Sequence, residues 1–177
     1  MQDLENALAV LGRAIHNEIS GQRFYSDASF YCIDPWAKDV FAELAREEER
    51  HTYLLLAEYE ALEKRGEWLD PDEAMLRGAE VDITDFTMPG DESAAELFPL
   101  QWSAGEVVDR RADDLAALAF GIRMEQQALA LYKEEADKST EPSAQKAYRL
   151  LIGEETKHYR QLRDQWERLA GMPFVGD

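Results

Sequence analysis

Two short stretches of the sequence carry the same pair of side chains that can bind a metal ion. In EEERHTYLLL, residues 47–56, His51 follows Glu48 by three positions, and in EETKHYRQL, residues 154–162, His158 follows Glu155 in the same way. Residues three apart on a helix are neighbours on its surface, so a carboxylate and an imidazole at this spacing can reach one metal site. The chain has only three histidines, and two of them occur in this pattern.

The two stretches belong to an internal repeat. An offset of 107 residues relates the two halves of the chain without a gap. Self-similarity at a fixed offset indicates a repeated structural unit, here two copies of one helical hairpin. The pairs related by this offset include Ile15 and Ile122, Glu18 and Glu125, Tyr25 and Tyr132, Glu48 and Glu155, His51 and His158, and Leu55 and Leu162.

Apolar residues recur every three or four positions in both copies, which is typical of helices packed in a bundle. Pro35 and Pro142 fit the first turn of a helix, and Asp34 is a favourable N-terminal cap. The stretch DPDEAMLRGAE predicts a further short helix. The four long helices are expected over residues 3–31, 35–64, 108–138 and 142–170.

The expected architecture is all-α: one domain over residues 1–177, built as a four-helix bundle from two repeated hairpins. The first hairpin covers about residues 1–64 and the second about residues 108–172. A long crossover, about residues 65–107, connects them and is too long for an ordinary loop. Such a crossover, returning along the bundle, is one established way to build four helices, and it relates the hairpins by a pseudo-twofold axis.

Six polar residues are expected to meet at one level in the interior of this bundle. In each hairpin the glutamate of the first helix and the Glu-x-x-His pair of the second lie at similar distances from the turn, at about 1.5 Å per residue. Four buried carboxylates would be very unfavourable without a counter-charge, which two divalent ions supply. A single Glu-x-x-His pair would more simply be explained as part of a solvated helix surface. Here, however, all six residues fit the same offset of 107 residues. The candidate metal ligands are Glu18, Glu48, His51, Glu125, Glu155 and His158.

The residue types of this set favour iron or manganese. Oxygen and nitrogen donors without thiolates suit these metals better than a structural zinc site. Tyr25 and Tyr132 lie two turns beyond the glutamates of their helices, on the same face. Their phenols either hydrogen-bond ligand carboxylates across the core or form an ordinary aromatic layer. Glu47 and Glu154, directly before two of the candidate ligands, are expected to be solvated.

The composition excludes several classes of protein. A net charge of −18, from 37 acidic and 19 basic residues, disfavours nucleic acid and anionic membranes as partners. No apolar run approaches the roughly 18 to 20 residues that span a bilayer. The acidic N-terminal stretch lacks the features of a signal peptide. Cys32 is the one cysteine, which excludes a disulfide within the chain and predicts a reducing, cytoplasmic location.

The sequence resembles the rubrerythrin-like branch of the ferritin-like diiron-carboxylate superfamily. AIHNEISGQRFY and FGIRMEQQALALY resemble its first-helix motif, and LAREEERH and LIGEETKH resemble its second-helix motif. The resemblance implies a ferritin-like bundle with a non-haem diiron centre held by the six candidates, with Glu48 and Glu155 bridging. True rubrerythrins have a further carboxylate at the position of Ala128, and a cysteine-rich rubredoxin domain that Cys32 alone cannot form.

The expected function follows from this resemblance. It is a non-haem diiron protein that reacts with peroxide or dioxygen, as a rubrerythrin-like peroxide reductase or a ferroxidase, with electrons from an external donor protein. The cofactor would be two iron ions, with manganese or a mixed pair as the alternative. Other functions left open are iron storage, a diiron oxygenase acting on an organic substrate, and a structural module. Storage requires a cage, whereas the long crossover favours a homodimer.

Overall fold

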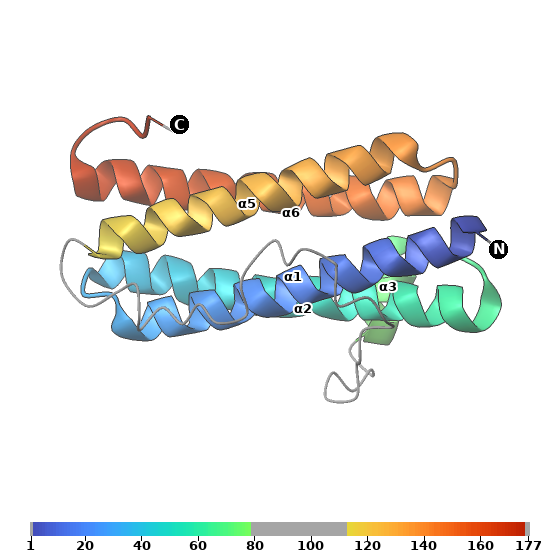
Figure 1. Ribbon diagram of the computed structural model, residues 1–177. Coiled ribbons are helices and arrows are strands. Elements are labelled where there is room, and N and C mark those ends of the chain that lie inside the picture. Colours follow the sequence, from blue (N-terminus) through green and yellow to red (C-terminus); the bar gives the residue numbers. More distant parts are fainter. Residues whose placement is uncertain (1, 79–112, 176–177) are drawn as a thin grey trace.

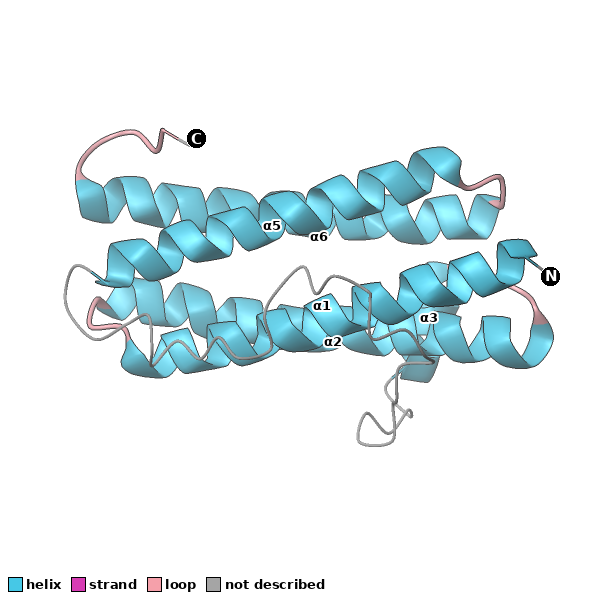
Figure 2. Ribbon diagram, in the orientation of Figure 1, coloured by secondary structure: helices cyan, strands magenta, loops and turns pink. Residues whose placement is uncertain are grey.

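The computed structural model describes residues 2–78 and 113–175. Five helices make up most of these residues, and no strand occurs among them (Figures 1 and 2). The prediction of an all-α, ferritin-like bundle is confirmed. The helices are α1 (Gln2–Tyr31), α2 (Pro35–Arg65), α3 (Pro71–Gly78), α5 (Asp113–Lys138) and α6 (Pro142–Ala170).

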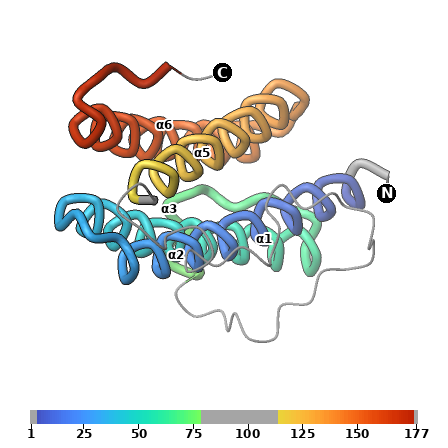
Figure 3. Tube along the Cα trace, turned by 60° about the vertical axis from the view of Figure 1, so that its left-hand side comes forward, coloured from blue at the N-terminus to red at the C-terminus, as the bar shows by residue number. Residues whose placement is uncertain are grey.

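Two antiparallel hairpins, α1–α2 and α5–α6, lie against each other and form the bundle (Figures 1 and 3). The contacts between the hairpins run from α2 to α6 and from α1 to α5. Helices α2 and α5 begin at the same end of the bundle (Figure 1). Arg65, where α2 ends, and Asp113, where α5 begins, therefore lie at opposite ends of the bundle. The predicted helical residues 108–112 lie outside the described part of the chain.

The helix ends follow the local sequence. Asp34 caps α2, because its Oδ1 accepts a hydrogen bond from the backbone N–H of Ala37 at 2.9 Å. Glu141, before α6, makes no such bond with its side chain. Helix α2 ends at Gly66, which has a φ of 68° and donates its N–H to the carbonyl of Leu62. This left-handed conformation suits glycine, which has no Cβ to clash.

The turn of the first hairpin is bound to both helices of the second. The buried carboxylate of Asp114, at the start of α5, accepts hydrogen bonds from the backbone N–H groups of Ile33 and Asp34, at 3.1 and 2.7 Å. Gln165 of α6 donates to Asp34 Oδ1 at 2.9 Å. These contacts fix the relative height of the two hairpins, on which any site between them depends.

Two apolar clusters fill the interior, one toward each end of the bundle. Residues related by the repeat fall into opposite clusters. Ile15 and Tyr132 lie in one cluster, whereas Ile122 and Tyr25 lie in the other. This exchange is what a pseudo-twofold axis between the hairpins requires. Among the described residues, no helix is long and apolar enough to cross a membrane.

Glu58 of α2 is a buried acid at one end of the bundle. Its Oε2 accepts the backbone N–H of Leu69 at 2.8 Å, which ties the segment before α3 to α2. Its Oε1 is buried without a hydrogen-bond partner in the described part of the chain. Burial raises the pKa of Glu58 to about 7 against the opposing effect of the Leu69 hydrogen bond, and the carboxylates of Asp70 and Glu73 add to the rise.

We expect Glu58→Gln to change the pH dependence of stability. The folded pKa of about 7 exceeds the unfolded value of about 4.3, so the native state binds more protons. The free energy of unfolding of the wild type should therefore fall as the pH rises from about 4.5 to 7, whereas Gln keeps an acceptor for Leu69 and carries no charge. Urea unfolding should show the variant about 3 kcal/mol more stable than the wild type at pH 8 and similar at pH 5.

The control for this experiment is Glu60→Gln, at an exposed glutamate of the same helix that pairs with Lys64. It should give a difference from the wild type that changes little with pH. If Glu58→Gln and Glu60→Gln show the same pH profile, Glu58 is not protonated in the native state near pH 6.

Candidate metal centre

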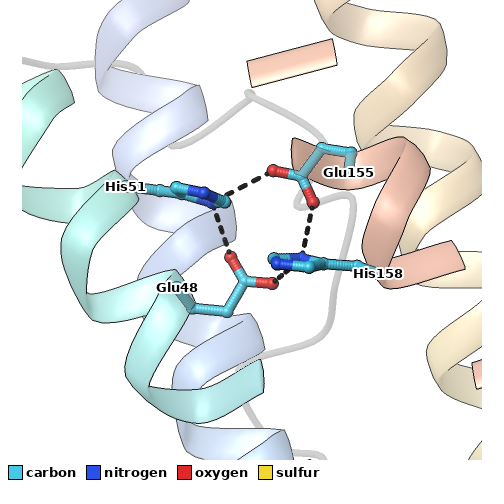
Figure 4. Close-up of side chains that lie close together, drawn as sticks. All are labelled: Glu48, His51, Glu155 and His158. Atoms are coloured by element: carbon cyan, nitrogen blue, oxygen red, sulfur yellow. Dashed lines mark hydrogen bonds and ion pairs between the residues drawn. The ribbon is translucent and has the colours of Figure 1, made fainter. Parts of the chain in front are cut away.

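Glu48 and His51 of α2 face Glu155 and His158 of α6 in the middle of the bundle (Figure 4). All four side chains are buried, and one ligand atom from each lies within 4.8 Å of those of the other three. They reach this position because each pair occupies the inward face of its helix, between the two apolar clusters.

Each of the two carboxylates spans both imidazole rings. Glu48 has Oε2 at 3.4 Å from Nδ1 of His51 and Oε1 at 3.3 Å from Nδ1 of His158. Glu155 has Oε1 and Oε2 at 3.1 Å from the same two nitrogens. The rings stack with centroids 5.3 Å apart and an angle of 21° between their planes. Both rings thus point the same nitrogen at the same pair of carboxylates.

Glu18 of α1 and Glu125 of α5 complete this layer. Glu18 Oε2 lies 3.2 Å from Nδ1 of His51, and Glu125 Oε1 lies 3.8 Å from Nδ1 of His158. Every one of the six residues singled out from the sequence is 4% exposed or less. The structure therefore brings all six together, one glutamate from each of α1 and α5 and a Glu-x-x-His pair from each of α2 and α6.

Two tyrosines connect the hairpins at this level. The hydroxyl of Tyr25 donates a hydrogen bond to Glu125 Oε1, and the hydroxyl of Tyr132 donates to Glu18 Oε1. The two bonds are equivalent under the repeat. Of the two roles considered for these tyrosines, the structure has the hydrogen bond across the core. Burial raises the pKa of both phenols well above 10, and the facing carboxylates raise it further, so both hydroxyls keep their protons.

The acids of the centre divide into two kinds. Burial raises the pKa of Glu18 well above its ordinary value, and the charges of Glu48 and Glu155 add to this rise. The pKa of Glu125 is raised for the same reasons. Burial alone would also raise the pKa of Glu48 and Glu155, but their contacts with both histidines and with Glu18 or Glu125 outweigh it and hold both values low.

The histidines show the opposite balance. Burial would lower the pKa of His51 and His158, but the contacts of their ring N–H groups with the surrounding carboxylates outweigh it and raise both values. The carboxylates thus hold positive charge at the Nδ1 positions of the two rings. A cation placed between these groups would meet the same favourable field, because the protons on the rings and a metal ion compete for the same lone pairs.

Glu47 makes a contact that the sequence did not predict. It was expected to be solvated, and this is wrong: its Oε2 lies 2.9 Å from Nε2 of His158, and its side chain is 24% exposed. The hydrogen bond to His158 lowers the pKa of Glu47. A carboxylate on Nε2 places the N–H there and turns the Nδ1 lone pair toward the centre, which is how proteins orient a metal-binding histidine.

The internal repeat gives no signal for this contact. The equivalent of Glu47 is Glu154, whose carboxylate pairs with Lys157 at 2.6 Å on the outside of α6. A search based on the repeat would therefore have treated the two glutamates alike.

The residues present fit a metal ion. Four carboxylates and two imidazoles form a mixed oxygen and nitrogen donor set that suits iron and related divalent cations. Glu155 Oε1 is fully buried and, although it lies 3.1 Å from His51 Nδ1, it accepts no hydrogen bond of normal geometry in the described part of the chain. A buried carboxylate oxygen with unused lone pairs, facing the centre, is a suitable ligand atom for a cation.

A four-helix bundle with one glutamate from each of two helices and a Glu-x-x-His pair from each of the others defines the ferritin-like class of metal-carboxylate proteins. Within this class, the model of the rubrerythrin family matches residues 9–165, and the chain belongs to that family. Proteins of the family bind iron, and the buried cluster of this chain could hold such a metal.

A solved structure has the same fold. It is the hypothetical protein Pfu-1136390-001 from Pyrococcus furiosus, which superposes with a TM-score of 0.69 over 96% of this chain and 93% of its own, at 21% sequence identity. At this identity the likeness concerns the fold alone. No curated protein is significantly similar to the chain in sequence.

We expect Glu47→Gln to weaken metal binding while Glu154→Gln does not. Glutamine at position 47 removes the negative partner of His158 Nε2, so the ring loses both its orientation and part of its basicity. Carboxylates in this position typically contribute about 10- to 100-fold in affinity, and we expect a loss of at least about tenfold.

The measurement is a competition titration with a chromophoric chelator, using ferrous iron under anaerobic conditions. Glu154→Gln is the matched control, since it makes the same substitution at the repeat-equivalent position, where the carboxylate pairs with Lys157 on the helix surface. Equal affinities for both variants would contradict the role given to Glu47.

Proposed function

We propose that the protein is a non-haem diiron oxidoreductase that reduces peroxide or dioxygen with electrons from a separate donor protein. The observation that carries this proposal is the geometry of Glu48 and Glu155, each of which spans both histidines and so can bridge two metal ions. The proposed ligands of the two ions are Glu18, Glu48, His51, Glu125, Glu155 and His158.

Charge balance supports two divalent ions. Four ionised carboxylates in an apolar interior need about four positive charges, and two divalent ions supply them. The imidazole and carboxylate donors suit iron, and manganese or a mixed pair fits the same donors. When bound, two iron ions would supply electrons to peroxide or dioxygen and polarise its O–O bond.

The protein residues keep the carboxylates and rings in place for this chemistry. Tyr25 holds Glu125 and Tyr132 holds Glu18, each through a phenol that stays protonated. Glu47 holds the ring of His158 from outside. The apolar clusters on both sides exclude bulk water, which strengthens every one of these interactions.

The composition supports an external source of electrons. A rubredoxin-type iron site needs four cysteine thiolates, and this sequence has one cysteine. Cys32 is buried and lies in the apolar cluster with Phe41 and Leu44. The residues of this sequence cannot form such a site by themselves, and we propose that a partner protein reduces the centre and that the protein is a homodimer.

We expect the purified protein to bind about two iron ions per chain, as in other dinuclear carboxylate bundles. Adding peroxide to the ferrous form should produce the near-ultraviolet absorption of ferric iron, and a chemical reductant should reverse it. Stopped-flow absorption measures the rate, and metal analysis measures the stoichiometry. An iron spectrum that does not change with peroxide or dioxygen would refute the proposed function.

Glu155→Gln tests whether the chemistry depends on the proposed bridging carboxylate. We expect it to lose at least about 100-fold in the rate of iron oxidation, because one of the carboxylates that would hold the ions is gone. Glu154→Gln, one residue earlier and on the helix surface, should react like the wild type.

A further inference from the structure

A small cavity lies against the carboxylates of the metal centre, between α1 and α5. All four central glutamates line it, and neither histidine does. It offers about 10 Å³ to the centre of a water-sized molecule, which is room for one such molecule. The other lining residues are Asn17, Gly21, Tyr25, Met124 and Ala128.

Small residues keep this space open. Gly21 and Ala128 occupy equivalent positions of the repeat, and both line the cavity. A Cβ atom at Gly21 would lie 3.6 Å from Cγ and Cδ of Glu48, in van der Waals contact with that carboxyl group. Larger side chains at these two positions would fill the cavity beside the carboxylates. The cavity therefore leaves space for a small ligand on the carboxylate side of the centre.

One hydrogen-bond donor of a residue in the cavity wall lacks a partner among the described residues. The side chain of Asn17 is buried, with the residue 5% exposed, and its Nδ2 has no hydrogen-bond partner in the described part of the chain. The hydroxyl of Tyr25 is already used, since it donates to Glu125. Met124, the repeat equivalent of Asn17, is a thioether and has no hydrogen to donate. Among the residues that line the cavity, the amide of Asn17 is thus a spare donor.

A buried donor without a partner destabilises the fold, and an apolar residue of similar size would remove this cost. The cost of burying such a donor is offset when a bound ligand accepts its hydrogen bond. Peroxide and related small anions carry lone pairs, and one end of such a ligand fits a cavity of this size. The four carboxylates alone would repel an anion. A bound cation would offset this repulsion, and a neutral donor in the cavity wall would add a hydrogen bond to the ligand.

We infer that Asn17 is a ligand-binding residue of the metal centre, whose side-chain amide donates a hydrogen bond to a small oxygen or nitrogen ligand held in the cavity. The inference rests on the proposed function, because the ligand enters a metal-loaded centre. Since Met124 offers no donor at the equivalent position, only one end of the ligand receives this bond. The two ends of a bound peroxide would therefore differ.

Azide is the probe, because it binds to ferric centres without turnover and can be titrated by visible absorption. In the iron-loaded, oxidised protein we expect Asn17→Leu to weaken azide binding by about tenfold, the usual effect of one hydrogen bond to a charged partner. In the metal-stripped protein the same variant should unfold about 2 to 4 °C higher, because a buried donor without a partner has been removed.

Two further variants complete the test. Asn17→Ala cannot overfill the site and should weaken azide binding to the same extent. Ser20→Ala is the matched control: its hydroxyl is also buried without a partner in the described residues, one turn along α1, but Ser20 does not line the cavity. Its azide affinity should equal that of the wild type.

The outcomes separate this inference from the proposed function. Unchanged azide affinity in both Asn17 variants, equal weakening in Ser20→Ala, or no azide binding to the wild type would overturn the role of Asn17. If azide binding depends on Asn17 but the iron does not react with peroxide or dioxygen, the inference stands and the proposed function fails.

Discussion

The burial of four carboxylates in the middle of a helical bundle is the constraint on which the rest of the structure depends. They lie between two apolar clusters, where an ionised carboxylate without a counter-charge costs several kcal/mol. The protein meets this cost with two imidazoles that converge on Glu48 and Glu155, and with phenols that donate to Glu18 and Glu125. Leucine in place of the acids would make a bundle without positive charge at this level more stable, and the buried cluster that the acids form could hold a metal ion.

The repeat supplies this layer twice, and its symmetry ends just outside the proposed ligands. The six residues and the two tyrosines are matched pair by pair. One layer further out, Glu47 bonds to His158 whereas Glu154 pairs with a lysine on the surface, and Asn17 faces the cavity opposite a methionine. The two metal positions of the proposed centre would therefore be inequivalent: an outer carboxylate holds the histidine of one, and one end of the cavity has a donor without a partner among the described residues.

Much of the fold and of the site could be predicted from the sequence because the constraints are local or repeated. The cap at Asp34 and the inward face of α2 depend on residues a few positions apart, and the offset of 107 residues transfers them to the second hairpin. The role of Tyr25 stayed open because it depends on the height of one hairpin against the other, which contacts such as those of Asp114 set. Glu47 was wrongly predicted because its position beside the α2–α6 contact follows from helix packing, and periodicity does not encode it.

Buried polar groups that the fold itself does not need are informative about chemistry. Glu58 is buried and acidic, but its Oε2 binds the backbone before α3, and Gln165, its repeat equivalent, likewise binds the turn at Asp34. Both hold segments at the ends of the bundle, so their burial has a structural explanation. Among the described residues Asn17 has no such structural role: its amide nitrogen has no hydrogen-bond partner there, and the residue lines a cavity together with four carboxylates. A buried polar group is thus explained either by a structural hydrogen bond, as in Glu58, or by a bound ligand, as we infer for Asn17.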